Sequence, residues 1–119
     1  MAEISFVAIA VQADARVYRA AGLATGDTTS VLTINQGDWD IGVHVYGTVG
    51  GATITILGGI ASEVTDLALI DDAYGSALSF TSLPQFKPVG PPARMLRGVV
   101  AAGAGTGITI DVIVTEKRL

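Results

Sequence analysis

Apolar and polar residues alternate along much of this chain, and a period of two is typical of half-buried β-strands. The clearest case is the segment 107–115. One of its faces carries branched aliphatic side chains only: Ile108, Ile110, Val112 and Val114. The other face carries Thr109, Asp111, Thr115 and, as an apolar exception, Ile113. Because successive side chains of a strand point to opposite sides of a sheet, this segment predicts a strand with one face in a core.

The same test predicts eight or nine short strands in all. Residues 4–12 form a nearly unbroken apolar run, which favours a strand covered on both faces. Further strands are expected at residues 31–35, 41–46, 52–57, 67–70, 77–81, 86–89, 94–102 and 107–115. Residues 13–24 have no convincing helical period, and Gly22 with its Thr, Gly and Asp neighbours predicts an irregular connection there.

Glycine and proline mark the expected turns. Gly50 and Gly51 predict a hairpin between the strands at 41–46 and 52–57, because glycine reaches the positive φ angles of tight two-residue turns. The glycine-broken segment 98–114 predicts a second hairpin. It also falls short of the about 18 to 20 uninterrupted apolar residues of a membrane helix. All four prolines lie between positions 84 and 92, in a predicted loop or sheet edge.

Many short strands, frequent turns and no predicted helix indicate an all-β protein. Its 119 residues are enough for one domain, with roughly two-thirds of the unfolded surface buried on folding. We therefore predict a single-domain β-sandwich of about eight strands over residues 1–119, with jelly-roll or immunoglobulin-like connectivity. Residues 1–27, the first strand and the irregular connection after it, are expected to take part in assembly.

Composition adds an expectation about surfaces. Half of the residues are hydrophobic and 15% are charged, against about a quarter in an average soluble domain. Because monomers rarely expose large apolar patches, this composition predicts that another subunit covers part of the surface. The net charge of -4 and the absence of Lys or Arg runs argue against nucleic acid as a partner. The N-terminal Met-Ala-Glu also lacks the basic start of a secretory signal.

The residues that could carry chemistry predict no enzyme. His44 is the only histidine and no Gly-x-Ser-x-Gly elbow is present, so a Ser-His-Asp device is not expected. Two acidic pairs stand out: Asp38 with Asp40 around Trp39, and Asp71 with Asp72 before Tyr74. Both have the composition of turns, in which Asp side chains bind nearby backbone amides, and neither forms a calcium-loop motif. No metal and no cofactor are expected.

Candidate contact residues are those whose side chains are favoured at protein interfaces. They form a cluster after the first strand, a second cluster beside the prolines, and a lone tryptophan: Arg16, Tyr18 and Arg19; Arg94 and Arg97; Trp39. For Trp39, capping the end of the core is the first expectation, with a sugar-stacking or subunit-contact role as the alternative.

The C-terminal half also resembles a known group of proteins. A Thr/Ile strand and a Gly-Gly break are followed by Asp-x-x-Gly-x-x-x-x-Phe-Thr, which runs from Asp71 or Asp72 to Phe80 and Thr81. A proline-containing linker, Arg94-Met-Leu-Arg97 and a glycine-rich stretch ending in Ile-Thr-Ile-Asp-Val come next. This order resembles the small β-sandwich structural proteins of tailed bacteriophages, in particular their capsid decoration, or cement, proteins.

The resemblance implies a role outside catalysis. A protein of this kind is made in the host cytoplasm and assembles, often as a trimer, on the outer capsid surface of the virion, where it clamps subunits of the major capsid protein. Neither nucleic acid nor a membrane is an expected partner. Two alternatives stay open: a carbohydrate-binding module, with Trp39 and Tyr46 or Tyr74 as stacking rings, and a tail or fibre component of the same virion.

Overall fold

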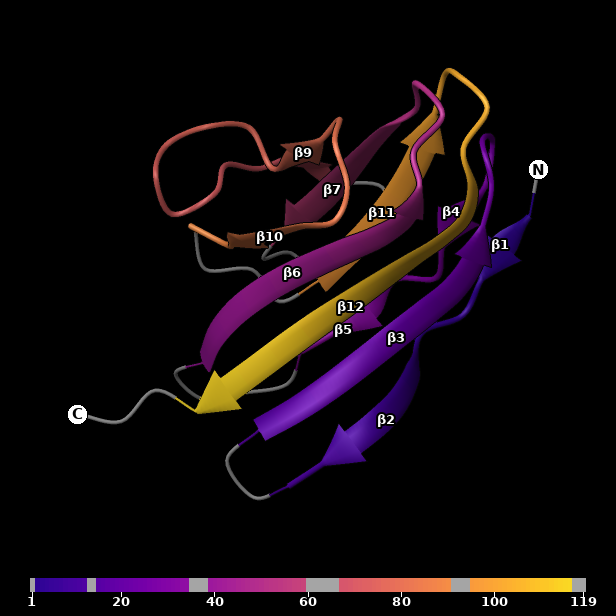
Figure 1. The fold of residues 1–119 in the computed structure, drawn as a ribbon. Helices are drawn as coiled ribbons and strands as arrows, with labels where there is room; N and C mark the ends of the chain where they lie inside the picture. The colour runs from indigo at the N-terminus through magenta and orange to yellow at the C-terminus, as the bar shows by residue number, and fades with distance from the viewer. Residues whose placement is uncertain (1, 13–14, 35–38, 60–66, 91–94, 117–119) are drawn as a thin grey trace.

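Two β-sheets packed face to face make up the protein (Figure 1). The computed structural model describes residues 2–12, 15–34, 39–59, 67–90 and 95–116. Within these residues the chain forms twelve strands and no helix, so the described part holds no helix that could cross a membrane. The front sheet, which faces the viewer in Figure 1, has the strand order β10-β6-β12-β3-β2. The back sheet has the order β1-β4-β11-β7-β8, with β5 beside β11 and β9 beside β7.

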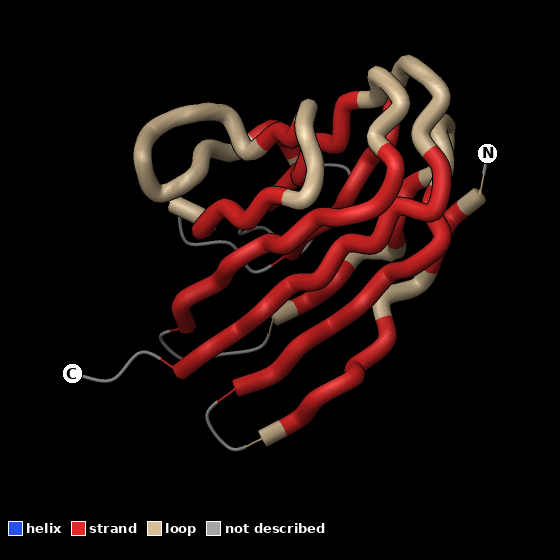
Figure 2. Tube along the Cα trace, viewed as in Figure 1, coloured by secondary structure: helices blue, strands red, loops and turns tan. Residues whose placement is uncertain are grey.

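The front sheet includes the three longest strands. Its members are β2 (Val7–Val11), β3 (Ala15–Leu23), β6 (Trp39–Thr48), β10 (Gln85–Pro88) and β12 (Thr106–Glu116). The back sheet is made of β1 (Glu3–Ile4), β4 (Thr28–Thr29), β5 (Leu32–Thr33), β7 (Thr53–Gly59), β8 (Ala68–Leu69), β9 (Ser79–Phe80) and β11 (Met95–Ala101). Figure 2 shows the loops gathered at the ends of these strands.

The core lies between the sheets and is filled by alternate residues of facing strands. From β12 it receives the predicted aliphatic face, each residue no more than 1% exposed: Ile108, Ile110, Val112 and Val114. From β6 and β7 come Val43, Val45, Ile54 and Ile56, and Phe80 of β9 packs among them. Fully burying one such side chain is worth about 1.5–3 kcal/mol, so this interior supplies the main stabilising term. The predicted β-sandwich and the predicted inward face of β12 are confirmed.

The strand positions are also largely as expected. Each of the eight segments predicted after residue 30 contains or overlaps a strand, from β5 to β12. The described residues hold twelve strands because the apolar run at 4–12 is divided between β1 and β2, and because β3 and β4 were not predicted. The choice between jelly-roll and immunoglobulin-like connectivity stays a prediction.

The N-terminal apolar run is not one strand covered on both faces, and that prediction is wrong. β1 pairs in parallel with β4 in the back sheet, whereas β2 pairs with β3 in the front sheet. Every residue of β2 is exposed. The unbroken apolar sequence thus predicted strand structure, but it did not predict which faces of the strand are covered.

The irregular connection predicted at 13–24 is likewise wrong, because β3 is a nine-residue strand that lies between β12 and β2 in the front sheet. Its residues pair with β12 from Ala15, opposite Thr115, to Leu23, opposite Ile108. The register shifts between Ile108 and Ile110, and Gly22 lies on the opposite strand at that point with a φ of 78°. Glycine here serves a bulge within a strand, not a break between strands.

Two glycine turns connect the two sheets instead of closing hairpins. Gly50 and Gly51 have the expected positive φ angles, but β6 and β7, on either side, belong to different sheets. Residues 102–105 likewise join β11 of the back sheet to β12 of the front sheet. The two turns pack together, since the Ala104 N–H donates to the Gly50 carbonyl at 2.8 Å. Both hairpin predictions are therefore wrong: glycine specifies a turn's backbone, not which strands pair around it.

Candidate assembly surface

β2 forms one edge of the front sheet and exposes an entirely apolar surface. Its residues, Val7, Ala8, Ile9, Ala10 and Val11, are all solvent-facing, and Val7, Ile9 and Val11 are 60%, 47% and 65% exposed. β2 pairs with β3 on one side, and no described strand pairs with its other side. An edge of this kind presents backbone N–H and C=O groups that can pair with another chain.

The other sheet edges in the described residues are blunted. At the opposite edge of the front sheet, β10 ends in Pro88, which has no N–H to donate. Lys87 of the same strand turns inward, where its Nζ donates to the Ser79 carbonyl at 2.7 Å. In the back sheet, the outer strands β1 and β8 have two residues each. Short strands, prolines and inward charges are the usual protections against edge pairing, and β2 has none of these three.

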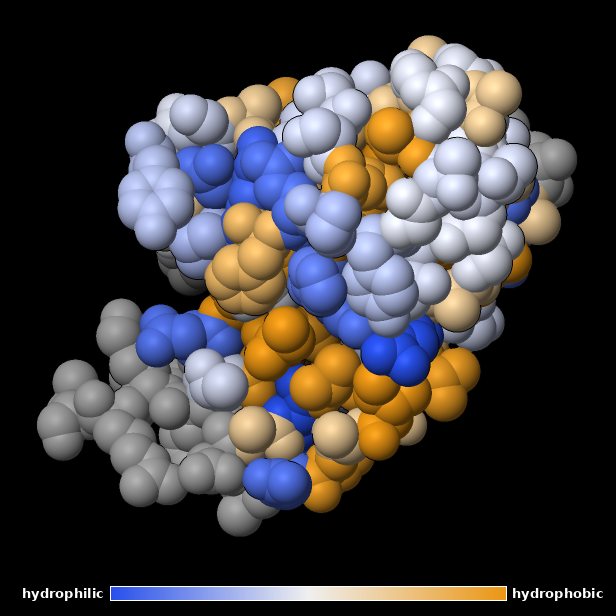
Figure 3. Space-filling model, in the orientation of Figure 1, coloured by the Kyte–Doolittle hydropathy of each residue, from blue (hydrophilic) through white to orange (hydrophobic). Residues whose placement is uncertain are grey.

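The apolar surface continues from β2 onto the outer face of the front sheet. The register places Ala10 beside Val17 of β3 and Val17 beside Ile113 of β12, all on the outer face. Figure 3 shows hydrophobic side chains gathered over β12, β3 and β2, with hydrophilic ones among them. We call this region, formed by Val7, Ile9, Ala10, Val11, Val17 and Ile113, the assembly surface.

A polar cluster lies beside the assembly surface and ties three strands together. Arg19 of β3 donates from Nε to Asp111 Oδ1 at 2.9 Å and from Nη2 to Oδ2 at 3.0 Å. Tyr46 of β6 donates from its hydroxyl to the same Oδ2 at 3.2 Å. Asp111 is 6% exposed although it lies on the outer face. The hydrogen bond to the Asp111 carboxylate raises the pKa of Arg19, so its guanidinium stays protonated at any ordinary pH.

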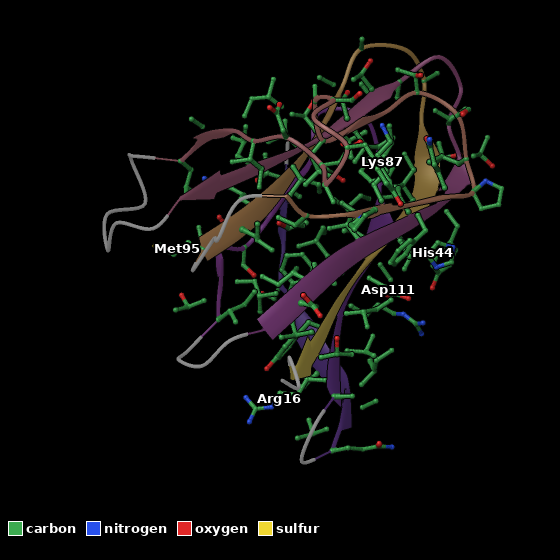
Figure 4. All side chains as sticks on the ribbon, turned by 90° about the vertical axis from the view of Figure 1, so that its left-hand side faces the viewer. Arg16, His44, Lys87, Met95 and Asp111 are labelled. Atoms are coloured by element: carbon green, nitrogen blue, oxygen red, sulfur yellow. The ribbon has the colours of Figure 1, made fainter. Side chains whose placement is uncertain are left out.

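Aromatic rings extend this cluster toward β10. The rings of His44 and Tyr46 lie 4.9 Å apart on the outer face of β6. The ring of Phe86 covers Gly42, because a Cβ at position 42 would collide with it. His44 therefore shares the outer face of β6 with Gly42 and Tyr46. Figure 4 shows His44 and Asp111 on the same side of the molecule.

Hydrogen bonds from the back sheet hold the segment that precedes β2. The Asp27 carboxylate accepts the Ala2 N–H at Oδ1 and the Ala24 N–H at Oδ2, both at 3.0 Å. The bonds from Ala24 and Ala2 lower the pKa of Asp27. Further along, the Phe6 N–H donates to Ser30 Oγ at 3.0 Å, just before β2 begins.

Arg97, one of the predicted contact residues, completes this support. From β11 its Nε donates to the Thr29 carbonyl at 3.1 Å, and its Nη2 donates to Glu3 Oε2 at 3.1 Å and to Thr28 Oγ1 at 3.2 Å. It thus joins three strands of the back sheet, β1, β4 and β11. Its guanidinium therefore binds groups of the same chain.

The structure does not bring Arg16, Tyr18 and Arg19 together. They lie in β3, where neighbouring side chains alternate between faces, and not in a loop as predicted. Tyr18 shares its register with Val112 and packs against the core. Arg16 is level with Val114, and Figure 4 shows it pointing to the side opposite Asp111. Arg19 alone lies on the outer face.

The remaining predicted contacts have different outcomes. Trp39 is the first residue of β6, with its backbone opposite Glu116, and its side chain lies outside the described part. Arg94 lies outside the described residues. Sequence reasoning did not name the five residues of β2 as candidate contacts, although they lie within the segment 1–27 that it expected to take part in assembly. Their signal was present in the run Val-Ala-Ile-Ala-Val, which combines strand-forming residues with no charge.

The turn role predicted for Asp71 and Asp72 is confirmed for Asp72. Its Oδ1 accepts the N–H groups of Tyr74 at 2.8 Å and Ser76 at 3.1 Å. An open depression of about 580 Å³ lies beside this turn and includes Gly90 in its lining. Among the described residues no three His, Asp or Glu side chains group in a way that could hold a metal ion. Asp38 lies outside these residues.

Comparison with protein-family models and with curated proteins finds no match for this chain. The fold and the surface therefore define a class by their geometry alone. It is a small β-sandwich whose front sheet ends in an apolar edge strand, β2, without the usual protections against edge pairing. Hydrogen bonds hold the segment that precedes this strand.

Proposed function

We propose that this chain is a bacteriophage structural protein that decorates the outer surface of the capsid as a homo-oligomer and stabilises the shell. The observation that carries the proposal is the exposed apolar edge β2 with the adjoining outer face of the front sheet. A surface of this kind is expected to be buried against another protein subunit in the assembled state. The β-sandwich fold agrees with the class that the sequence resembles.

The use of the polar side chains supports binding over catalysis. The side chains of Asp111 and Arg97 make three hydrogen bonds each and that of Asp72 makes two, all to partners within the chain. A catalytic group must instead reach a substrate atom. These residues hold strands and a turn in place, which suits a rigid scaffold that presents surfaces.

The mechanism of stabilisation is mass action. A protein that binds only correctly placed capsid subunits adds its binding free energy to the assembled shell and not to the dissociated one. An oligomer that engages several lattice points gains effective concentration for each later contact, so weak contacts together hold firmly. The partner in this proposal is the major capsid protein, and the location is the outside of the virion. The resemblance implies a trimer, which differs from the pair inferred in the next subsection, and the mass of the chain in solution distinguishes the two.

The test compares complete particles with particles that lack this protein. We expect the deficient particles to lose DNA at lower temperature and on milder osmotic shock, and purified protein added back to bind them and to restore both tolerances. Equal tolerance of the two preparations, together with no binding of added protein, overturns the proposal.

Two further measurements separate the alternatives. Labelled electron microscopy that locates the protein on tails or fibres, and not on capsids, favours the tail component. Binding to defined glycans in a glycan screen, lost when Tyr74 is replaced by Ala, favours the carbohydrate-binding module. Tyr74 suits that variant because its ring is exposed in the turn after Asp72, far from any role in the core.

A further inference from the structure

We propose that β2 pairs antiparallel with β2 of a second copy of this chain, about a two-fold axis that passes between the two strands and is normal to the sheet. The two five-stranded front sheets then become one continuous sheet of ten strands. This inference rests on the self-association in the proposed function, and not on the capsid as its target.

The choice of occupant follows from the edges that the molecule offers. An edge strand needs a partner strand of similar length with free backbone groups, and β2 has five residues. Among the described edges, β10 ends in Pro88 and the strands β1 and β8 have two residues each. The edge that suits β2 best is therefore β2 itself. Pairing of one patch with its own copy closes the assembly at two subunits, whereas pairing with a different edge continues into rings or fibres.

The side chains of β2 are compatible with pairing of this strand with its own copy. All five are Val, Ala or Ile, so no charge is buried and no like charges meet. The two outer-face residues, Val7 and Ala10, lie beside Arg19 and Val17 of β3, whereas Ala8 and Val11 lie on the inner face beside Tyr18 and Arg16. Across a two-fold axis normal to the sheet, outer residues must meet outer residues, as in any β-ladder.

This requirement fixes the possible registers. The sequence Val-Ala-Ile-Ala-Val reads the same in both directions, which by itself favours an axis at Ile9. The bulge between Ala8 and Ala10 excludes that axis, because it places Val7 and Val11 on opposite faces. Faces match in two registers. With the axis level with the Ala8–Ile9 bond, Val7 is opposite the second copy's Ala10. With the axis level with the Ile9–Ala10 bond, Ala8 is opposite the second copy's Val11.

The first test is the mass of the intact chain in solution. Sedimentation equilibrium at tens of micromolar is expected to give twice the chain mass of 12.1 kDa. Ile9→Lys places a charge in the contact and is expected to weaken dimerisation by at least tenfold. Leu69→Lys is the matched control, since Leu69 is a similarly exposed apolar residue on β8, an edge strand of the back sheet, and this variant should remain a dimer.

Because the chain has no cysteine, a second test uses designed disulfides and does not depend on the lysine variant folding. Under mild oxidation, either the double variant Val7→Cys with Ala10→Cys or the double variant Ala8→Cys with Val11→Cys is expected to form covalent dimers. Within one extended strand these positions are about 10 Å apart, too far for an internal disulfide.

Any of four results overturns the two-fold pair. The wild type is a monomer or a trimer in solution, the Ile9→Lys variant stays fully dimeric, or oxidation crosslinks neither double variant. A trimer would do so while leaving capsid decoration in place. Conversely, a dimer with these properties that fails to bind deficient particles supports the pairing and overturns the proposed function alone.

Discussion

Thr29 offers a sharp test of how buried hydrogen bonds stabilise the back sheet. This residue of β4 is 0% exposed, and its hydroxyl serves two backbone groups. Oγ1 accepts the Gly98 N–H at 2.8 Å and donates to the Ser30 carbonyl at 2.8 Å. Thr29→Val keeps the shape of the side chain and removes both bonds, whereas Thr29→Ser keeps the hydroxyl and removes one methyl group.

The two variants separate hydrogen bonding from apolar burial. In Thr29→Val the buried Gly98 N–H loses its partner, which costs about 1–3 kcal/mol, and we take about 2 kcal/mol as the expected loss. In Thr29→Ser the lost methyl costs about 1 kcal/mol. Unfolding entropy of about 2.1 cal/mol/K per residue gives about 0.25 kcal/mol/K for 119 residues. The expected fall in Tm is therefore about 8 °C for valine and about 4 °C for serine.

Thermal and urea denaturation at one fixed protein concentration measure both effects, since self-association makes Tm depend on concentration. The expected order of stability is wild type, then Thr29→Ser, then Thr29→Val. Apolar burial and strand propensity alone predict the opposite order for the two variants, because valine is the better strand former. A valine variant as stable as the wild type would refute the role given to this hydroxyl.

Two further predictions concern pH and salt. The pKa of Asp27 is lowered by the N–H groups of Ala24 and Ala2, so its carboxylate stabilises the fold fully above the ordinary value of 3.8 and loses this effect as the pH falls through the lower folded pKa. Urea midpoints measured below pH 4 should therefore fall less steeply for Asp27→Asn than for the wild type, and parallel curves would contradict this. The subunit contact should be insensitive to salt, because screening acts on charges and β2 has none. A dissociation constant that changes more than about threefold between low and moderate salt would point to a charged contact instead.

The sequence predicted the parts of the fold that depend on local periodicity. In β12, alternation at residues 108–114 identified the core face, because a period of two must place one set of side chains inward. The same logic located β5 to β11. Pairing could not be predicted in this way, since alternation on 41–46 and 52–57 is equally compatible with one sheet or two. Gly50 and Gly51 indicated the turn. The local sequence did not indicate that this turn connects two sheets and packs against the distant turn at 102–105.

The candidate site shows the same limit. Arg19 was selected for its residue type, but its partner Asp111 is 92 positions away, and nothing local connects the two. The irregularity attributed to 13–24 came from Gly22, whose positive φ serves a bulge inside β3. For β2, the apolar run correctly indicated a strand with an apolar surface. What the run could not indicate was that the described chain leaves this surface uncovered.

The support of β2 bears on how tightly a second copy can bind. A strand that must be ordered on binding loses conformational freedom at that step, and this loss subtracts from the affinity. β2 is already paired with β3, and the segment before it is fixed through Ser30. Asp27 and Arg97 hold the adjoining β1 against the back sheet. In the proposed pair, the edge is thus formed before the second copy binds. Most of the free energy of apolar burial then remains available for association, and a contact of only five residues per chain can suffice within a multivalent lattice.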